Sequence, residues 1–323
     1  MEGQIIIRSV KLLKLWLSFC CVFCCTSLRA SQVYDCFLFF NEVELLKVRF
    51  EELYDSVDFF VLVEATQTFC GGSKPLYFLD HIHDFAKYKD KIIHVVVDDF
   101  PMPTSDPAQD RWTREAFQRD AILRGLVHCK QDDIIFISDL DEIPSRQAIR
   151  EVKNYFRRPS HSAVTKLSES RLICELHMKL FLFFLNCESP YGWKGAAKAA
   201  PYWIVKKRLP WNLKILHMYD RNLHKINNAG WHFHNLFGNK QTLVEKLNSC
   251  YRYNPERDFA NGISQDWIST LSTVENWEHN SEGFMEWTLT TFGYQIVVLD
   301  DSYPQYILDH REYFRDLGWF MPN

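Results

Sequence analysis

This chain of 323 residues lacks several common features, and these absences narrow what it can be. It has no block of basic residues and a formal net charge of −4, so nucleic acid is not an expected partner. It has no Asn-x-Ser or Asn-x-Thr sequence, which excludes ordinary N-glycans on the chain itself. Internal repeats and low-complexity tracts are absent too. What is present, 47% hydrophobic and 15% aromatic residues, is ample for a sizeable core.

The apolar run near the amino terminus, Leu15–Leu28, is too short for a standard membrane span. Arg8, Lys11 and Lys14 precede it. This pattern in residues 1–30 is typical of a signal peptide cleaved after Ala30, or of a short signal anchor with its basic flank in the cytosol. Both alternatives place the remainder in the secretory lumen. We expect a type II protein of the Golgi membrane or, after cleavage, a secreted protein, with membrane contact only through this segment.

Six cysteines follow that segment, and none of them forms a Cys-x-x-Cys pair with another, which argues against a zinc site. An even count in an oxidising lumen permits up to three disulfides, whose connectivity the sequence does not reveal. The six are Cys36, Cys70, Cys129, Cys174, Cys187 and Cys250.

The stretch Asp132–Pro144 is the most informative part of the chain. Two acids open it, and four apolar residues follow, three of them β-branched, as in a strand buried on both faces of a parallel sheet. Asp139, Asp141 and Glu142 then fall at the carboxyl end of this strand, where ligands bind in open α/β sheets. On an extended backbone Asp139 and Asp141 share a face, so we predict that both hold a divalent cation bridging to phosphate oxygens. The alternative is a solvated acidic turn in which Asp139 or Ser145 caps the next helix.

Strands and helices alternate through the first half of the chain, which predicts an α/β fold with a doubly wound, Rossmann-like, mostly parallel sheet and helices on both faces. The expected strands are Val33–Phe40, Asp58–Ala65, Lys91–Val97 and Asp133–Ile137, and the expected helices are Val43–Tyr54, His81–Tyr88 and Arg111–Cys129.

The pattern changes after about Arg158. The dense apolar run Leu172–Asn186 could be a strand or a core helix, and we favour a strand. Thr242–Tyr251 and Asp266–Val274 have helical spacing. We expect this mixed second half to add strands to the edge of the first sheet.

Six motifs follow one another along the chain: Tyr34–Phe37, Phe40–Glu42, Val61–Thr66, Arg111–Asp120, Ser138–Ser145 and Ala229–Phe233. In this order they resemble glycosyltransferase family 17, and the resemblance covers roughly Tyr34 to Phe237. Two segments depart from the family. Leu180–Asn186 lacks the tyrosines of the relatives, and the residues after His232 lack their usual serine.

The resemblance implies a GT-A type fold, a UDP-GlcNAc donor, a divalent metal that is usually manganese, and inversion at the anomeric carbon. It also implies a glycan or glycoprotein acceptor, such as the β-mannose of an N-glycan. Residues 31–323 would then form one catalytic domain, with a nucleotide-sugar-binding half at 31–158 and an acceptor-side half at 159–323. The alternatives are a transferase with another UDP-sugar donor and a catalytically weak carbohydrate-binding protein on the same fold.

The resemblance also adds His232 to the expected metal ligands, because manganese accepts imidazole as well as carboxylate. The alternative for His232 is a hydrogen-bonded histidine of the core. His234 lies two residues further on and would share its face in a strand, but we rank it lower.

Donor-binding residues are expected at the ends of the first two strands, where nucleotides bind in such folds: Asn41, Glu42 and Glu64. Arg119 and Asp120 match the family's helical motif, and an arginine can bind a diphosphate bidentately. For each of these residues the alternative is a cap, a turn or a solvated helix face.

An inverting transferase also needs a base that takes a proton from the acceptor hydroxyl. We nominate Asp266, because Ser264–Trp267 places an acid beside an aromatic ring that could stack on a sugar. Trp231 and Trp193 are further candidates for sugar stacking, although tryptophan is more often simply buried.

Overall fold

The computed structural model describes residues 31–157, 168–195, 197–236, 289 and 293–320. The chain divides into two compact units, Met1–Ser31 and Gln32–Asn323, and the account below concerns the second. Among the described residues, no helix has both the length and the apolar character needed to cross a membrane. The apolar run Leu15–Leu28, the two helices predicted between residues 242 and 274, and the nominated base Asp266 lie outside the described residues.

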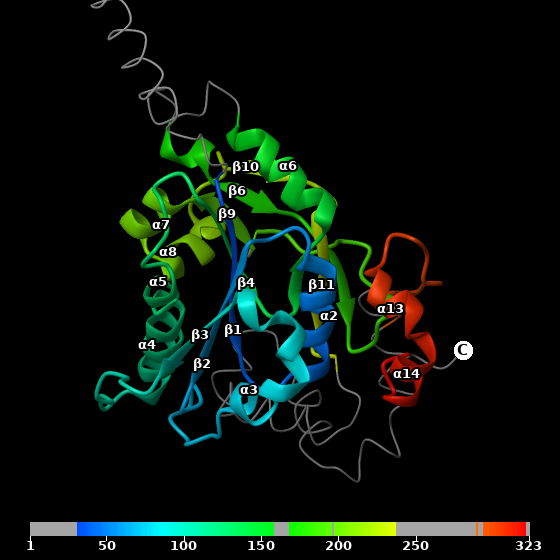
Figure 1. Ribbon diagram of the computed structural model, residues 1–323, viewed down its shortest axis with the longest axis horizontal. Coiled ribbons are helices and arrows are strands. Elements are labelled where there is room, and N and C mark those ends of the chain that lie inside the picture. Colours follow the sequence, from blue (N-terminus) through cyan, green and yellow to red (C-terminus); the bar gives the residue numbers. More distant parts are fainter. Residues whose placement is uncertain (1–30, 158–167, 196, 237–288, 290–292, 321–323) are drawn as a thin grey trace, which may run out of the picture. The chain divides into compact units, whose positions relative to one another are not determined.

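A seven-stranded sheet carries most of the second unit (Figure 1). Four of its strands run parallel, as the alternation of strands and helices predicts, so the α/β class is confirmed. Three strands from the second half of the chain extend the sheet beyond β4, as expected, and β9 runs antiparallel to β4. In spatial order the strands are β10 (His224–Ile226), β6 (Cys174–Leu176), β9 (Lys198–Pro201), β4 (Ile134–Asp139), β1 (Val33–Phe39), β2 (Phe59–Ala65) and β3 (Ile92–Val97).

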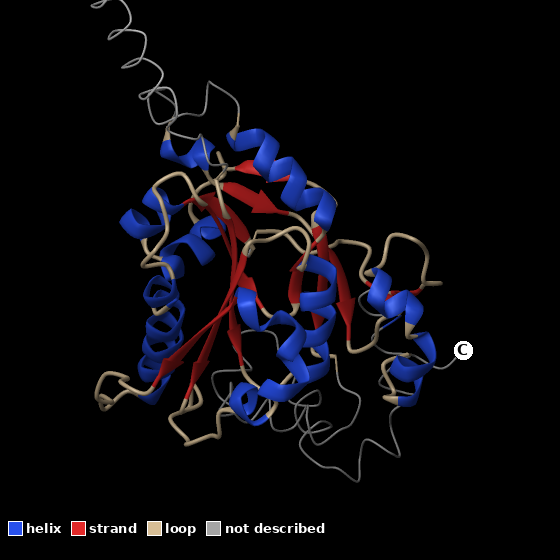
Figure 2. Cartoon of the chain, viewed as in Figure 1, coloured by secondary structure: helices blue, strands red, loops and turns tan. Residues whose placement is uncertain are grey.

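Helices cover both faces of this sheet (Figure 2), because alternate strand residues point to opposite sides. In β1, Tyr34 and Cys36 join one buried cluster, whereas Phe37 and Phe39 join the other. The helices on the Tyr34 side are α4 (Pro107–Asp120), α5 (Ile122–Gly125), α7 (Tyr202–Arg208) and α8 (Pro210–Lys214); those on the Phe37 side are α2 (Val43–Leu53), α3 (Tyr77–Asp80), η1 (Ile82–Lys91) and α6 (Arg146–Phe156).

A second sheet of five strands packs into the same core as Phe37 and Phe39. The chain enters it from β4 through a turn at Leu140 and Asp141. Its spatial order is β12 (Gln295–Ile296), β8 (Cys187–Glu188), β7 (Lys179–Leu182), β11 (Gly230–His234) and β5 (Glu142–Pro144). The remaining described elements are η3 (Glu169–Leu172), η4 (Leu216–Met218), α13 (Gln305–Asp309) and α14 (Arg311–Asp316).

Three sequence predictions need correction. The helix expected at Arg111–Cys129 begins earlier, because Asp106 caps it by accepting the N–H groups of Ala108 and Gln109, and it is interrupted after Asp120. The helix expected at His81–Tyr88 is the short α3 followed by a 3-10 helix. The apolar run Leu172–Asn186 forms two short strands, β6 and β7, rather than one.

The five cysteines in the described part of the chain are free thiols, so none of the disulfides that the even count permits forms among them. Burial keeps the Cys187 and Cys129 thiols protonated, because desolvation disfavours the thiolate. Desolvation raises the pKa of Cys187 to about 11 and that of Cys129 to about 12.

Arg49, on α2, is completely buried and braces the turn between β4 and β5. Its guanidinium pairs with Asp35 of β1 through hydrogen bonds of 2.6 and 2.7 Å. Its Nη1 donates to the carbonyl oxygens of Asp139, Leu140 and Glu142 at 2.8 to 3.0 Å. A buried charge of this kind is tolerated only when it is paired and its donors are satisfied. The pair therefore links α2, β1 and the turn that separates the two sheets.

We predict that Arg49→Met destabilises the protein by roughly 3–5 kcal/mol, because it leaves Asp35 as an unpaired buried charge. Denaturant unfolding followed by circular dichroism measures this loss. The double variant Asp35→Leu/Arg49→Met should recover part of it. Lys47→Met on the same helix is the control, because Lys47 is partly exposed and should change stability little. A loss for Arg49→Met no larger than that of the control contradicts the prediction.

Candidate active site

The candidate site is a cavity of about 320 Å³. The ends of β1 and β4, the loop after β2, one side of α4, and the end of β11 contribute to it. β1, β2 and β4 are neighbouring parallel strands, and their carboxyl ends are the position at which α/β sheets bind ligands. Its charged and polar lining includes Glu42, Lys74, Arg111, Glu115, Gln118, Arg119, Asp139, Asp141, His232, His234 and Asn235.

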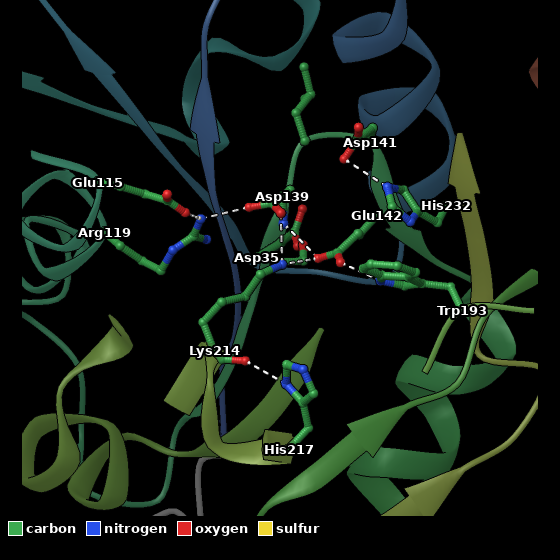
Figure 3. Close-up of polar contacts among 12 residues, drawn as sticks. Asp35, Glu115, Arg119, Asp139, Asp141, Glu142, Trp193, Lys214, His217 and His232 are labelled. Atoms are coloured by element: carbon green, nitrogen blue, oxygen red, sulfur yellow. Dashed lines mark hydrogen bonds and ion pairs between the residues drawn. The ribbon is translucent and has the colours of Figure 1, made fainter. Parts of the chain in front are cut away.

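Two cations hold Asp139 at the end of β4 (Figure 3). Nη2 of Arg119 lies 2.8 Å from its Oδ1, and Nζ of Lys214 lies 2.9 Å from its Oδ2. Desolvation alone would raise the pKa of Asp139, but Lys214 and Arg119 outweigh it and hold this pKa well below its usual range. Asp139 is therefore ionised at neutral pH, and each of its oxygens already faces a cation.

The prediction that Asp139 and Asp141 share one face is wrong, because the backbone turns at Leu140 and Asp141 instead of staying extended. Asp139 faces α4 and α8, whereas Asp141 points toward His232 (Figure 3). A metal ion bound to Asp139 would lie beside the positive charges of Arg119 and Lys214, which oppose its binding.

Glu142 is fully buried behind this turn and connects its neighbours. It accepts the backbone N–H of Asp139 at 2.9 Å and the indole N–H of Trp193 at 2.6 Å, and it pairs with Lys214. The ring of Trp193 in turn packs against His232, with their centroids 4.5 Å apart. Glu142 therefore ties the Asp139 side of the cavity to the His232 side.

Asp141, His232 and His234 form a second cluster, in which one ligand atom from each lies within 4.8 Å of the others. His232 and His234 are two residues apart in β11, so both side chains leave the strand on the same face. The backbone N–H of Phe233 donates to the Asp141 carbonyl at 2.9 Å, which fixes the turn against this strand. Nδ1 of His232 is buried and has no hydrogen-bond partner in the structure. One carboxylate and two imidazoles are a suitable donor set for a divalent metal.

Helix α4 supplies Arg111, Glu115 and Arg119 to the cavity lining. Arg114, on the same helix, does not line the cavity. Arg114 instead donates to the carbonyl of Phe69. Desolvation raises the pKa of Glu115, Asp139 adds to this effect, and Arg119 opposes it.

Of the other predicted substrate-binding residues, only Glu42 lines the cavity with Arg119. Asn41 precedes it and donates its backbone N–H to Glu42 at 3.1 Å. Glu64 is fully buried within β2, where it accepts the N–H of Phe78 at 3.1 Å. Asp120 accepts the N–H of Trp211 at 2.8 Å and so fixes the start of α8.

Trp231 is buried and is not part of the cavity lining. Its indole N–H donates to the carbonyl of Ser302 at 3.0 Å, and its ring stacks on Phe233. Trp193, in contrast, lines the cavity beside His232. Among the described tryptophans, Trp193 is therefore better placed than Trp231 to contact a bound sugar.

No local sequence pattern marks Lys214, which lies 75 positions after Asp139 in the chain. Only the packing of α8 against α4 and β4 brings it to the site. Glu142 lies in the stretch Asp132–Pro144, which the sequence singled out. Its buried contacts with Lys214 and Trp193 could not be predicted, because both partners are distant in the chain.

Gly230 permits β11 to lie close against β5. Its φ angle is +137°, and an added Cβ would lie 2.1 Å from the carbonyl oxygen of Ile143. Only glycine adopts this conformation without strain and leaves this space. The close approach positions the strand that carries His232 and His234.

Residues 17–163 match the sequence model of Glycosyltransferase family 17, which confirms the predicted resemblance for the five motifs between Tyr34 and Ser145. The sixth motif, Ala229–Phe233, lies outside the matched residues. The chain is also similar to the human and rat proteins named beta-1,4-mannosyl-glycoprotein 4-beta-N-acetylglucosaminyltransferase, each 35% identical over 122 residues. These matches cover 36% of this chain and 22% of each relative, so they span about a fifth of the relatives' length.

Solved structures give weaker matches. A glucosyl-3-phosphoglycerate synthase from Mycobacterium tuberculosis, solved with Mn²⁺, UDP-glucose and phosphoglyceric acid, is 13% identical with a TM-score of 0.35. The match covers 86% of this chain and 91% of that chain. A mycobacterial protein matches with 12% identity and a TM-score of 0.37, over 68% of this chain and 75% of its own. Likenesses of this strength support no inference about this chain.

We predict that Gly230→Ala destabilises the protein by at least about 1–3 kcal/mol, because the new Cβ collides with the backbone of β5 in a strained conformation. Thermal and denaturant unfolding measure the loss. Gly72→Ala is the matched control, since Gly72 is exposed and its nearest contact would be Thr68 Oγ1 at 3.5 Å. Equal stability of the two variants would show that β11 and β5 do not depend on the glycine.

Proposed function

We propose that this chain, whose residues 17–163 match glycosyltransferase family 17, is a metal-dependent glycosyltransferase with its donor site in the cavity described above. The proposed donor is UDP-GlcNAc and the proposed acceptor is a glycan, in accord with the names of the human and rat relatives. Inversion at the anomeric carbon is part of the same proposal. The main support for this proposal is that Arg119 has buried donors without a hydrogen-bond partner.

Arg119 is 2% exposed and lines the cavity, yet two of its donors, Nε and Nη1, are buried without a hydrogen-bond partner in the structure. Leaving a buried donor unsatisfied costs about 1–3 kcal/mol. An anion in the cavity would satisfy these donors, and arginine matches the oxygens of a diphosphate well. This supports Arg119 as the residue that binds the diphosphate of the donor.

A divalent metal fits the other side of the same cavity, where Asp141, His232 and His234 would hold it. The donor set is suitable, and Nε2 of His232 already lies 3.6 Å from Oδ1 of Asp141. When bound, the ion would supply positive charge that stabilises the leaving diphosphate. We propose Mn²⁺, because it accepts both carboxylate and imidazole ligands.

Other residues of the chain would bind the donor, stack on the sugar and accept the proton. Arg119 binds and orients the diphosphate, and Asp139 fixes Arg119 through its 2.8 Å ion pair. Trp193 offers a ring at the cavity wall on which a sugar can stack. Asp266 remains the proposed base that takes the proton of the acceptor hydroxyl.

We also propose that the catalytic unit lies in the lumen of the secretory pathway, at the Golgi membrane or secreted. This proposal rests on the basic flank and apolar run between Arg8 and Leu28.

Arg119→Met should weaken UDP binding by about 1.5–3 kcal/mol, the range for hydrogen bonds to a charged group. It should weaken binding of UMP less and leave uridine unaffected, because the lost interaction is with the diphosphate. Titration calorimetry in Mn²⁺ with the three ligands measures this series. Arg124→Met is the matched control, because Arg124 pairs with Asp99 on the surface and does not line the cavity.

The same preparations test catalysis. UDP-GlcNAc should be hydrolysed slowly in Mn²⁺ without an acceptor, and activity should disappear in excess EDTA and in Asp141→Asn. Faster hydrolysis of UDP-glucose or UDP-galactose would reassign the donor sugar. Full activity in EDTA, or equal loss of UDP and uridine binding in Arg119→Met, would contradict the proposed function.

A further inference from the structure

The loop between β2 and α3 forms one wall of the cavity, to which it contributes Gln67–Phe69 and Lys74. Its backbone folds back on itself. Gln67 pairs with Ser73 in an antiparallel bridge, and the N–H of Gly71 donates to the Thr68 carbonyl at 2.9 Å. No residue from 66 to 77 is buried, so this loop has no apolar core of its own. A wall of this kind keeps its position only if another element holds it.

Arg114 of α4 supplies that support from behind the wall. It is 8% exposed and does not line the cavity. Its Nη1 donates to the carbonyl of Phe69 at 3.1 Å, and hydrogen bonds from a charged donor are among the stronger ones. Gly71 has a φ angle of +85°, and a Cβ added to it would lie 3.1 Å from Nη2 of Arg114. The guanidinium therefore packs against the loop backbone as well as bonding to it.

The part of α4 that carries Arg114 is itself anchored on both sides. Asp110, one turn before Arg114, is buried, and its Oδ1 accepts the N–H and the hydroxyl of Thr104, each at 2.8 Å. Gln118, one turn after Arg114, donates its side-chain amide to the carbonyl of Val63 in β2 at 3.2 Å. Because the helix is fixed to the sheet, Arg114 fixes the loop relative to the sheet too.

The side chains of this wall differ from those on the charged side of the cavity. Gln67, Thr68 and Phe69 offer an amide, a hydroxyl and an aromatic ring, all of them neutral. Lys74, the cation that this loop adds to the lining, lies 3.6 Å from the carboxylate of the buried Glu64, which matches its charge. Neutral hydrogen-bonding groups beside a ring suit a base and its ribose, which carry no charge, better than a phosphate.

We infer that Arg114 is a positioning residue that holds this loop wall where it receives the nucleoside part of the donor. The inference rests on the proposed function, in which Arg119 of the same helix binds the diphosphate. Arg114 acts through the loop, whereas Arg119 contacts the ligand. Replacing each arginine should therefore affect a different part of the same molecule.

Arg114→Met should weaken the binding of UDP and of uridine by a similar factor, about tenfold, which is the equilibrium equivalent of one hydrogen bond from a charged group. It should leave the binding of inorganic diphosphate unchanged. Arg119→Met should have the opposite pattern, with uridine binding retained. Titration calorimetry of the full chain with the three ligands measures both variants, and Arg124→Met is the control because Arg124 pairs with Asp99 on the surface. Unchanged uridine affinity in Arg114→Met, or an equal loss of diphosphate binding, overturns the inference.

The same contact can be tested from the loop. Gly71→Ala should reproduce the ligand pattern of Arg114→Met, because the new Cβ meets the guanidinium. Gly72→Ala is the matched control, since its nearest contact would be Thr68 Oγ1 at 3.5 Å. The double variant Gly71→Ala/Arg114→Met should bind uridine little more weakly than either single variant, because both changes disturb one contact. Fully additive losses would show that the two residues act separately and would contradict the inference.

Hydrogen exchange gives a measurement that needs no ligand. The amides of Thr68 and Gly71 bond within the loop, to the carbonyls of Gly72 and Thr68, and should exchange faster in Arg114→Met while the amides of β2 stay protected. If the wild type binds neither UDP nor uridine, the proposed function fails, whereas faster exchange still shows that Arg114 holds the loop. If UDP binds and Arg114→Met changes neither loop exchange nor uridine affinity, only the inference about Arg114 fails.

Discussion

The buried guanidinium of Arg49 is the interaction on which the arrangement of this site depends. It neutralises Asp35 inside the sheet, donates to Ser138 Oγ at 2.6 Å, and binds three carbonyl oxygens of the following turn. These hydrogen bonds stabilise the backbone of that turn, because the charge that makes them cannot leave the core without a large penalty. Because the turn is fixed, the two aspartates on it are separated into different environments.

Because of this separation, the two sides of the cavity suit ligands of opposite charge. On one side Arg119 is a cation with unsatisfied donors, and Asp139 holds it in place. On the other side Asp141 and two histidines are suited to a cation. A metal–diphosphate complex carries both charges and would satisfy both sides at once, whereas either charge alone would satisfy only one. Glu142, Lys214 and Trp193 connect the two sides, so a ligand bound at one side meets a preorganised partner at the other.

Much of the first sheet could be predicted from the sequence, because strands buried on both faces have continuous apolar runs that few other structures require. The position of the acidic stretch at the end of β4 follows from the same reasoning. The turn at Leu140 could not be predicted, since it depends on Arg49 from another element. A signal for Arg49 was present nevertheless. Asp35 and Arg49 are opposite charges within otherwise apolar faces of a strand and a helix, a pattern that favours a buried pair.

The second half was harder to predict for a physical reason. Its strands are two to five residues long and gain their stability from pairing with distant segments, so local periodicity is weak. Lys214 and Trp193 reach the site only through such long-range packing. In the sequence, Gly230 and the two histidines distinguish the segment that forms β11. His234 was ranked below His232 as a metal ligand, because its suitability depends on Asp141 lying across from it.

We propose that this cavity holds a metal ion on the Asp141 side and a nucleotide diphosphate against Arg119. A crystal structure of the protein with Co²⁺ and UDP, with anomalous data collected at the cobalt edge, tests it most directly. We expect one anomalous peak in the cavity, bonded to Asp141, His232, His234 and a phosphate oxygen, with Arg119 donating to the diphosphate and still paired with Asp139. A peak bonded to Asp139 with Arg119 displaced, or UDP bound outside the cavity, would contradict it.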